Sequence, residues 1–270
     1  MAMKVSEIRL YPVKGLRGFS VSEAVVEPWG LEGDRRWMIV DGQGRFLTQR
    51  EVPAMATIDA FLSDGGLRFA AAGHGEIEVA TPDGAPSLEV TIWKDRLLAT
   101  PADIRSSIWL SGVLGLPCQL VHMTDPAKAR QVDLDYAQPG DHVSFADGYP
   151  VLITAAASLE ALNGKLAEPV PMNRFRPNIV VSGAGAWEEN TWGDVRVGAV
   201  EFRGVKPCAR CVVTTVDQAS GEKSEDGEPL RTLAKINRSK TGRIIFGENL
   251  VTAGVGVIAV GDTVIATTRR

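Results

Sequence analysis

Cysteine is scarce in this sequence of 270 residues, and its scarcity excludes several kinds of site. Only Cys118, Cys208 and Cys211 occur. An odd number of thiols is typical of a reducing compartment and does not suit a disulfide framework. Three thiols are also too few for the four thiolates that hold an ordinary iron–sulfur cluster.

Long apolar runs and runs of basic residues are missing as well. No window approaches the roughly 18 to 20 apolar residues that a membrane helix needs, and no apolar signal core follows Met1. The formal net charge of -4 and the lack of a Lys/Arg cluster argue against a nucleic-acid partner. We therefore expect a cytoplasmic protein with no membrane and no nucleic-acid interaction.

Strand signals dominate the first hundred residues, separated by turn formers such as Asp41-Gly42 and Asp64-Gly65-Gly66. Short antiparallel strands in a barrel or sandwich are therefore predicted. The expected strands are 5–13, 21–27, 36–41, 46–49, 55–62, 67–72, 76–80 and 88–93. A helix after Asp103 is expected to carry Ile104, Ile108, Val113 and Leu114 on one side.

The second half of the chain alternates strands and helices. A polar stretch, residues 124–139, is interpreted as the joint, which divides the chain into a β-rich domain at 1–123 and a second domain at 124–270. Helices are expected around Leu159–Leu166 and 229–236. The expected strands are 150–154, 178–182, 195–205, 242–246 and 256–266. The predicted fold class is mainly β with some α.

The strongest candidate for a functional site is the segment Cys208-Ala209-Arg210-Cys211, because a thiolate beside a guanidinium suits metal or covalent chemistry. Its spacing alone is a weak signal. A zinc site would need further ligands from Cys118, His74, His122 or His142, which form no second pair. A thioredoxin-like dithiol should open a helix, whereas residues 212–216 are expected to continue as strand.

In an extended segment, side chains an odd number apart point to opposite faces. We therefore expect one thiol, that of Cys211, to face a site, and Cys208 to pack as a small buried hydrophobe, as does Cys118.

Several cations lie next to the ends of predicted strands in other parts of the chain. They are Lys14, which precedes Gly15, and Arg35, Arg50 and Arg176. Any one of them is more often a solvated surface charge. Together they are what a phosphate-bearing cofactor needs, because guanidinium binds phosphate bidentately.

Four motifs, in order along nearly the whole chain, resemble the MOSC (molybdenum cofactor sulfurase C-terminal) family, and most closely the branch that includes the mitochondrial amidoxime-reducing component. They are Tyr11-Pro12-Val13-Lys14-Gly15, Asp34-Arg35-Arg36-Trp37-Met38-Ile39-Val40-Asp41, Phe175-Arg176-Pro177-Asn178-Ile179-Val180-Val181-Ser182-Gly183, and Cys208-Ala209-Arg210-Cys211 with Thr214-Thr215-Val216-Asp217. The resemblance implies an N-terminal β-rich domain followed by a MOSC β-barrel domain with flanking helices.

The resemblance also implies a molybdenum cofactor and the residues that hold it. The second cysteine of the motif, Cys211, would bind the molybdenum and serve as the catalytic residue. The implied cofactor-binding residues are Lys14, Gly15, Arg35, Asp147, Gly148, Arg176 and Arg210. Animal members have serine where this chain has Gly15, so only backbone contact is expected there.

The activity implied by the resemblance is that of an oxidoreductase that cleaves the N–O bond of a small N-hydroxylated substrate. Electrons would come from a separate carrier, either ferredoxin-like or cytochrome-type with a reductase, since the chain has no cluster of its own. Two alternatives stay open: a sulfur carrier that uses a persulfide on Cys208 or Cys211, and a non-catalytic molybdenum cofactor carrier.

Overall fold

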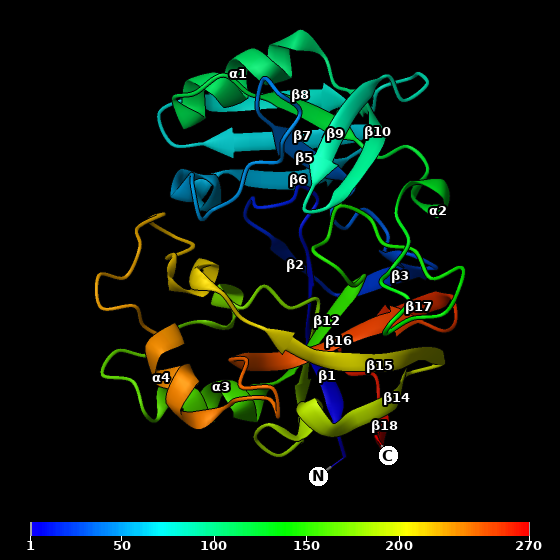
Figure 1. The fold of residues 1–270 in the computed structure, drawn as a ribbon, viewed down its shortest axis with the longest axis vertical. Helices are drawn as coiled ribbons and strands as arrows, with labels where there is room; N and C mark the ends of the chain where they lie inside the picture. The colour runs from blue at the N-terminus through cyan, green and yellow to red at the C-terminus, as the bar shows by residue number, and fades with distance from the viewer. Residues whose placement is uncertain (1, 270) are drawn as a thin grey trace.

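The larger of two β-rich halves is organised around an eight-stranded sheet in the computed structural model, which describes residues 2–269 (Figure 1). In spatial order its strands are β18 (Val264–Thr268), β14 (Trp192–Val197), β15 (Val200–Ala209), β16 (Ile245–Thr252), β12 (Val151–Ala155), β13 (Ile179–Ser182), β1 (Lys4–Leu10) and β2 (Phe19–Val21). β12 and β13 are parallel, and the other neighbours are antiparallel.

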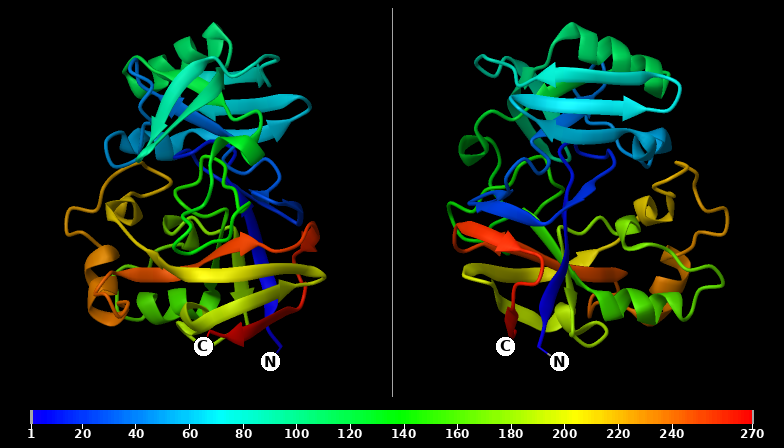
Figure 2. Two further views of the ribbon diagram at one scale, coloured as in Figure 1. Left: turned by 45° about the vertical axis from the view of Figure 1, so that its right-hand side comes forward. Right: turned by 180° about the vertical axis from the view of Figure 1, so that it is seen from behind.

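A second, three-stranded sheet covers the first and consists of β17 (Gly256–Ala259), β3 (Glu23–Glu27) and β4 (Gly30–Leu31). Alternating apolar residues of both sheets form one core, which includes Val5 and Ile8 of β1 together with Phe202 of β15. The N-terminal strands β1 to β4 thus pack with strands from the end of the chain, and both termini lie at the same end of the molecule (Figure 2).

The other half carries two further sheets and the longest helix. One sheet has the order β5 (Trp37–Val40), β11 (Gln119–His122), β10 (Asp95–Pro101) and β9 (Leu88–Ile92), and the other has β6 (Asp59–Ser63), β7 (Gly66–Ala71) and β8 (Gly75–Ala80). α1 (Ile104–Leu114) packs with these strands around a second core. The predicted division of the chain at residue 123 stays a prediction.

The remaining helices are short. They are α2 (Pro126–Ala129), α3 (Ala156–Asn163) and α4 (Leu230–Ile236), with 3-10 turns η1 (Pro53–Thr57), η2 (Met172–Arg174), η3 (Glu188–Thr191) and η4 (Val212–Thr215). No helix within the described residues is long and apolar enough to cross a membrane. The mainly β fold class with some α is confirmed.

The helix at α1 was predicted correctly, but its buried face was not. Asp103 caps it by accepting a hydrogen bond from the backbone N–H of Ser106 at 2.8 Å. The buried stripe contains Leu110 and Leu114, whereas Ile104 and Ile108 are exposed. The two isoleucines lie on another face of the helix, about a third of a turn away from the stripe.

Several strand predictions were wrong in part. The predicted strand 195–205 spans β14 and β15, and 256–266 spans β17 and β18. Residues 46–49 form no strand, residues 53–57 form η1 before β6 begins, and residues 212–215 form η4. In η4 the backbone N–H and the hydroxyl of Thr214 both donate to the carbonyl of Cys211, at 3.1 and 3.0 Å. A threonine hydroxyl that bonds the local backbone competes with a strand ladder, which the β-propensity of the segment did not reveal.

Two buried carboxyl groups make the eight-stranded sheet sensitive to pH. Glu248 of β16 is fully buried, and desolvation raises its pKa to about 8 although one oxygen pairs with Arg269. Desolvation also raises the pKa of Glu189 to about 7, and its charge opposes ionisation of Glu248. The folded protein therefore holds protons that the unfolded chain releases near the ordinary glutamate pKa of 4.5.

We expect the free energy of unfolding to fall as pH rises from about 4.5 to about 8, because the unfolded state then binds fewer protons than the folded state. Glu248→Gln should be more stable than the wild type at pH 8 by about 1 to 3 kcal/mol and nearly equal to it at pH 5. Urea unfolding at both pH values measures this, with the exposed Glu201→Gln as control. An equal pH dependence in the wild type and Glu248→Gln would contradict the assignment.

Candidate functional site

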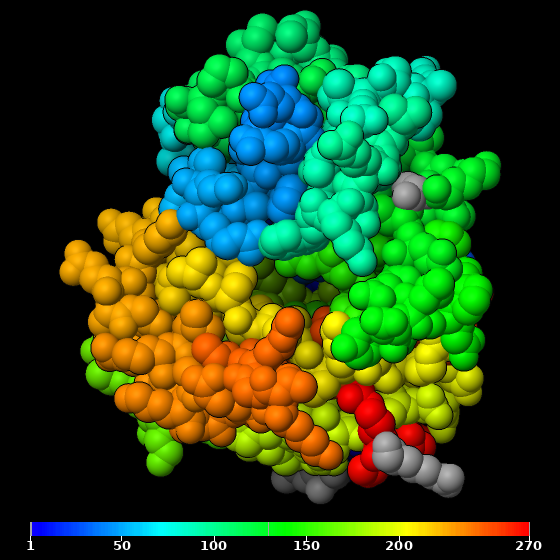
Figure 3. All heavy atoms as spheres, in the orientation of Figure 1, coloured from blue at the N-terminus to red at the C-terminus, as the bar shows by residue number. Residues whose placement is uncertain are grey.

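A cavity between the two halves collects every site residue predicted from the sequence. These residues are Lys14, Gly15, Arg35, Asp147, Gly148, Arg176, Arg210 and Cys211. They come from the segments after β1 and β4, from the loop before β12, from the segment before β13 and from the end of β15. The space-filling view shows a hollow in the middle of one face, between the blue and cyan half and the yellow and orange half (Figure 3).

The cavity is strongly positive although the chain has a formal net charge of -4. Its lining includes five cationic side chains, those of Lys14, Arg35, Arg50, Arg176 and Arg210, and a single carboxylate, that of Asp147. Within residues 2–269, no ion pair to a carboxylate is formed by Arg50, Arg176 or Arg210. Such a lining favours an anionic ligand.

Arg35 and Arg176 lie on the same aromatic ring. The guanidinium carbon of each is 4.3 Å from the ring centroid of Tyr11, a cation–π distance. Arg35 also donates hydrogen bonds to Asp34 at 2.6 Å and to Asn178 at 3.0 Å. Tyr11 and Asn178 belong to the quoted motifs, and they hold the two guanidinium groups in place.

The buried positive charge of Arg176 has no directly paired carboxylate among residues 2–269. Burial lowers its pKa to about 10, so the side chain stays protonated near neutral pH. Its one hydrogen bond to a side chain runs from Nη1 to the Gln218 amide oxygen at 3.3 Å. Asp34 and Asp147 act on this charge only from beyond ion-pair distance. A desolvated charge without a directly paired carboxylate is costly, and an anion bound beside it would offset that cost.

Lys14 and Asp147 form an ion pair inside the cavity. Desolvation lowers the pKa of Lys14, and Asp147 opposes this effect. For Asp147, desolvation acts to raise the pKa, but the Lys14 ammonium outweighs it and holds the pKa below its ordinary value. Gly15 follows with a φ of 83°, and an added Cβ would meet the Met55 methyl at 2.8 Å. The positive φ favours glycine at this position, and a larger residue would have to displace the end of the flexible Met55 side chain.

A buried arginine outside the cavity lining fixes the loop that carries Asp147. Arg130 donates to the backbone carbonyls of Ser144, Ala146 and Asp147 at 2.8, 2.7 and 3.0 Å. Its Nε also donates to Asp95 at 3.0 Å. Arg130 therefore joins this loop to the start of β10 and positions one side of the cavity.

The thiol of Cys211 is exposed in the cavity, just after β15 ends and before η4 begins. Arg50, from the other half of the molecule, approaches it with Nη1 at 3.6 Å from the sulfur. A sulfur atom accessible from the cavity and beside a guanidinium is a suitable soft ligand for a metal.

The prediction that Cys208 packs away from the site was wrong. Cys208 is half-buried and lines the same cavity as Cys211, because the pairing of β15 with β16 is irregular at Pro207 and the strand ends at Ala209. Arg210 donates to the Cys208 sulfur at 3.0 Å and to the carbonyl of Phe175 at 2.6 Å. Arg210 thus supports the backbone beside Arg176 as well as lining the cavity.

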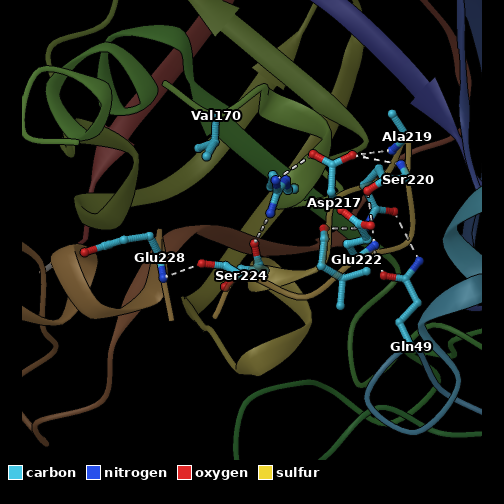
Figure 4. A network of polar contacts seen from close by, with 12 residues as sticks. Gln49, Val170, Asp217, Ala219, Ser220, Glu222, Ser224 and Glu228 are labelled. Carbon is cyan, nitrogen blue, oxygen red and sulfur yellow. Dashed lines mark hydrogen bonds and ion pairs between the residues drawn. The ribbon is translucent and has the colours of Figure 1, made fainter. Parts of the chain in front are cut away.

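The loop after η4 makes hydrogen bonds that connect the segment of Cys208 and Cys211 to the half of the molecule that carries Gln49 (Figure 4). The side-chain amides of Gln49 and Gln218 exchange two hydrogen bonds, at 3.1 and 2.9 Å, and both residues are buried. Asp217 accepts from the backbone N–H groups of Ala219 and Ser220 at 2.8 and 3.0 Å. The pair of Gln49 with Gln218 fixes the position of the segment that carries Arg50 relative to the segment that carries Cys211.

A zinc site has no support in the described residues. Within them, no group of three or more His, Cys, Asp or Glu side chains could hold a metal ion. Cys118 is buried in the core beneath α1, as expected. His122 stacks near Trp37 at 4.5 Å, and burial lowers its pKa to about 4, so it is a packing residue.

Sequence reasoning missed Arg130 and Trp93, which contacts Asp147. It also did not include Arg50 among the residues expected to bind the cofactor. Arg130 lies in the polar stretch interpreted as the joint, and no local pattern marked it. Arg50 was noticed as one of several cations, but nothing in the sequence indicated its approach to Cys211. Long-range side-chain contacts of this kind leave no spacing signal.

The family models match both halves of the chain. The MOSC N-terminal beta barrel domain matches residues 2–117, and the MOSC domain matches residues 140–265. The β-rich fold is thus that of a MOSC protein with two matched domains. This chain belongs to the MOSC family.

Two groups of relatives resemble the chain over most of its length. Mitochondrial amidoxime-reducing component 1 of Mus musculus is 32% identical over 96% of this chain and 81% of its own, and that of Homo sapiens is 31% identical over 96% and 82%. Molybdenum cofactor sulfurase of Oryza sativa subsp. japonica is 30% identical over 90% of this chain and 32% of its own. The YUAD protein from Bacillus subtilis, a solved structure, has a TM-score of 0.47 at 9% identity over 100% of this chain and 98% of its own.

Arg130→Met should lower the free energy of unfolding by about 2 to 4 kcal/mol, because Asp95 loses its partner and three carbonyls lose a donor. The exposed pair of Arg96 with Glu89, whose atoms are 3.9 Å apart, is a matched control. Arg96→Met should change stability by less than about 1 kcal/mol. Similar urea-unfolding midpoints for both variants would refute the positioning role of Arg130.

Proposed function

We propose that this protein is an oxidoreductase that depends on a molybdenum cofactor and reduces small N-hydroxylated compounds. The observation that supports this most is an exposed cysteine sulfur in a cavity lined by five cations and one carboxylate. A pterin-linked phosphate needs such a cationic lining, and molybdenum accepts a thiolate ligand. The names of the relatives, amidoxime-reducing component and molybdenum cofactor sulfurase, agree with it.

The residues present fit this cofactor by their donor chemistry. Cys211 would bond the metal, and Arg176 and Arg50, which lack carboxylate partners, would bind the anionic part. The orphaned Nε of Arg210 is a further donor. Gly15 would leave only its backbone facing the ligand.

When bound, the cofactor supplies the two-electron redox chemistry that removes oxygen from an N–O bond. In this reaction, one N-hydroxylated molecule takes up two electrons and two protons. The products are the reduced nitrogen compound and one molecule of water. The role of the chain is to hold the reacting groups. Lys14, which pairs with Asp147, lines the same cavity as Cys211 and would be placed to supply a proton there. Electrons would come from a separate carrier protein.

A sulfur-carrier function is the second candidate, since Cys208 and Cys211 line the same cavity and Arg210 donates to the Cys208 sulfur. Protein made in a molybdenum-competent host should be analysed for metal, pterin and cyanide-labile sulfur, and assayed with benzamidoxime and a chemical electron donor. Bound cofactor with turnover supports the reductase. Labile sulfur without turnover supports the carrier, and cofactor with neither supports a storage protein.

Cys211→Ser should reduce benzamidoxime turnover to background, because the proposed bond to the metal is lost. Cys208→Ser should keep most of the turnover, since a serine hydroxyl still accepts the hydrogen bond from Arg210. Steady-state kinetics on protein of known molybdenum content compares the two variants. Equal loss in both would overturn the assignment of one sulfur ligand.

Arg176→Ala should lower cofactor occupancy by about tenfold or more, because a charge-assisted hydrogen bond is worth about 1.5 to 3 kcal/mol. The thermal unfolding midpoint of the cofactor-free protein should not fall, since an uncompensated charge is removed. Arg196→Ala, on the exposed side of β14, is the control for both measurements. Occupancy equal to that of the control would remove Arg176 from the phosphate site.

A further inference from the structure

The tip of the β9–β10 hairpin carries an aromatic residue in a strained conformation. The two strands pair up to Ile92 and Asp95, so that Trp93 and Lys94 form the turn. Trp93 has a φ of 55°, a region that glycine adopts easily and bulky residues rarely do. Two-residue hairpin turns use a positive φ at this position, and here the position carries a bulky indole at the tip of the hairpin.

The ring lies at the rim of the cavity. Its centroid is 5.0 Å from that of Phe46 and 4.6 Å from the guanidinium carbon of Arg50, and its Nε1 donates to Asp147 at 3.3 Å. These three neighbours all line the cavity, yet 46% of Trp93 remains exposed. The turquoise segment that contains this hairpin overhangs the hollow in the space-filling view (Figure 3).

Arg50 connects the indole to the thiol. Its guanidinium stacks on Trp93 and also places Nη1 at 3.6 Å from the Cys211 sulfur. The indole and the sulfur therefore both contact the same guanidinium group. A small molecule whose reacting end reaches the Cys211 region would extend its other end toward Trp93.

We propose that Trp93 is a specificity-determining residue that binds the aromatic group of an N-hydroxylated substrate, an inference that rests on the proposed function. The ring offers a flat apolar surface at the cavity mouth, and its position is fixed by Arg50, Phe46 and Asp147. Pairs of aromatic rings gain about 0.5 to 1.5 kcal/mol beyond the burial of their area. Aryl amidoximes are therefore preferred over alkyl amidoximes of the same reacting group.

The test is the ratio of kcat/KM for benzamidoxime to kcat/KM for acetamidoxime, measured on the molybdenum-loaded protein with a chemical electron donor. Trp93→Gly should lower this ratio by about 3- to 10-fold, mainly through KM for benzamidoxime. Glycine suits the positive φ, so the thermal unfolding midpoint should change by less than about 3 °C. Trp93→Phe keeps a ring but loses the hydrogen bond to Asp147, and it should keep most of the ratio.

Calorimetric titration of benzamidoxime into the resting holoprotein gives a readout without turnover. The Kd of Trp93→Gly should be about 3- to 10-fold weaker than that of the wild type. If Trp93→Gly lowers kcat/KM for benzamidoxime and for acetamidoxime by the same factor, Trp93 serves only to hold Arg50 and Asp147. The inference then fails. If the wild type reduces acetamidoxime but shows no preference for benzamidoxime, the inference also fails while the proposed function stands. If it reduces neither substrate, the proposed function itself fails.

Discussion

Repulsion among like charges is the constraint on which the site depends. Lys14, Arg35 and Arg176 lie close enough that the charge of Arg35 lowers the pKa of each of the other two, and desolvation acts in the same direction. Two nearby carboxylates, those of Asp34 and Asp147, and the ring of Tyr11 offset part of this repulsion. A cavity built in this way has excess positive charge, and an anionic ligand is the simplest means of balancing it.

The same constraint explains why the site lies between the two halves. Residues 4–31 join the sheets of the C-terminal half and bring Lys14 and Arg35 to the cavity, while Arg176 and Cys211 arrive from β13 and β15. Gln49 and Gln218 then tie the halves together with a buried pair of hydrogen bonds. Because neither half holds the complete set of cations, the affinity for an anion depends on the contact between them.

Period and turn signals in the sequence were sufficient for most strands and for α1. The four motifs contain six of the eight predicted residues that line the cavity, and Asp147 and Gly148 came from a looser match outside the motifs. Sequence signals failed where side chains redirect the backbone. The hydroxyl of Thr214 turns a β-prone segment into η4, and an irregularity near Pro207 brings Cys208 to the cavity. Arg130 and Trp93 act through contacts with residues distant in sequence, and no local pattern encodes such contacts.

Backbone strain in the described part of the chain is concentrated around the cavity. Of the four non-glycine residues with positive φ between residues 2 and 269, Arg35, Arg176 and Trp93 lie at the cavity or its rim, and only Trp187 lies elsewhere. Such conformations cost roughly 1 to 3 kcal/mol each and persist only where the surroundings enforce them. Stacking on Tyr11 holds two of them and stacking with Arg50 holds the third. The strained positions therefore carry two guanidinium groups that line the cavity and one indole that contacts three of its lining residues.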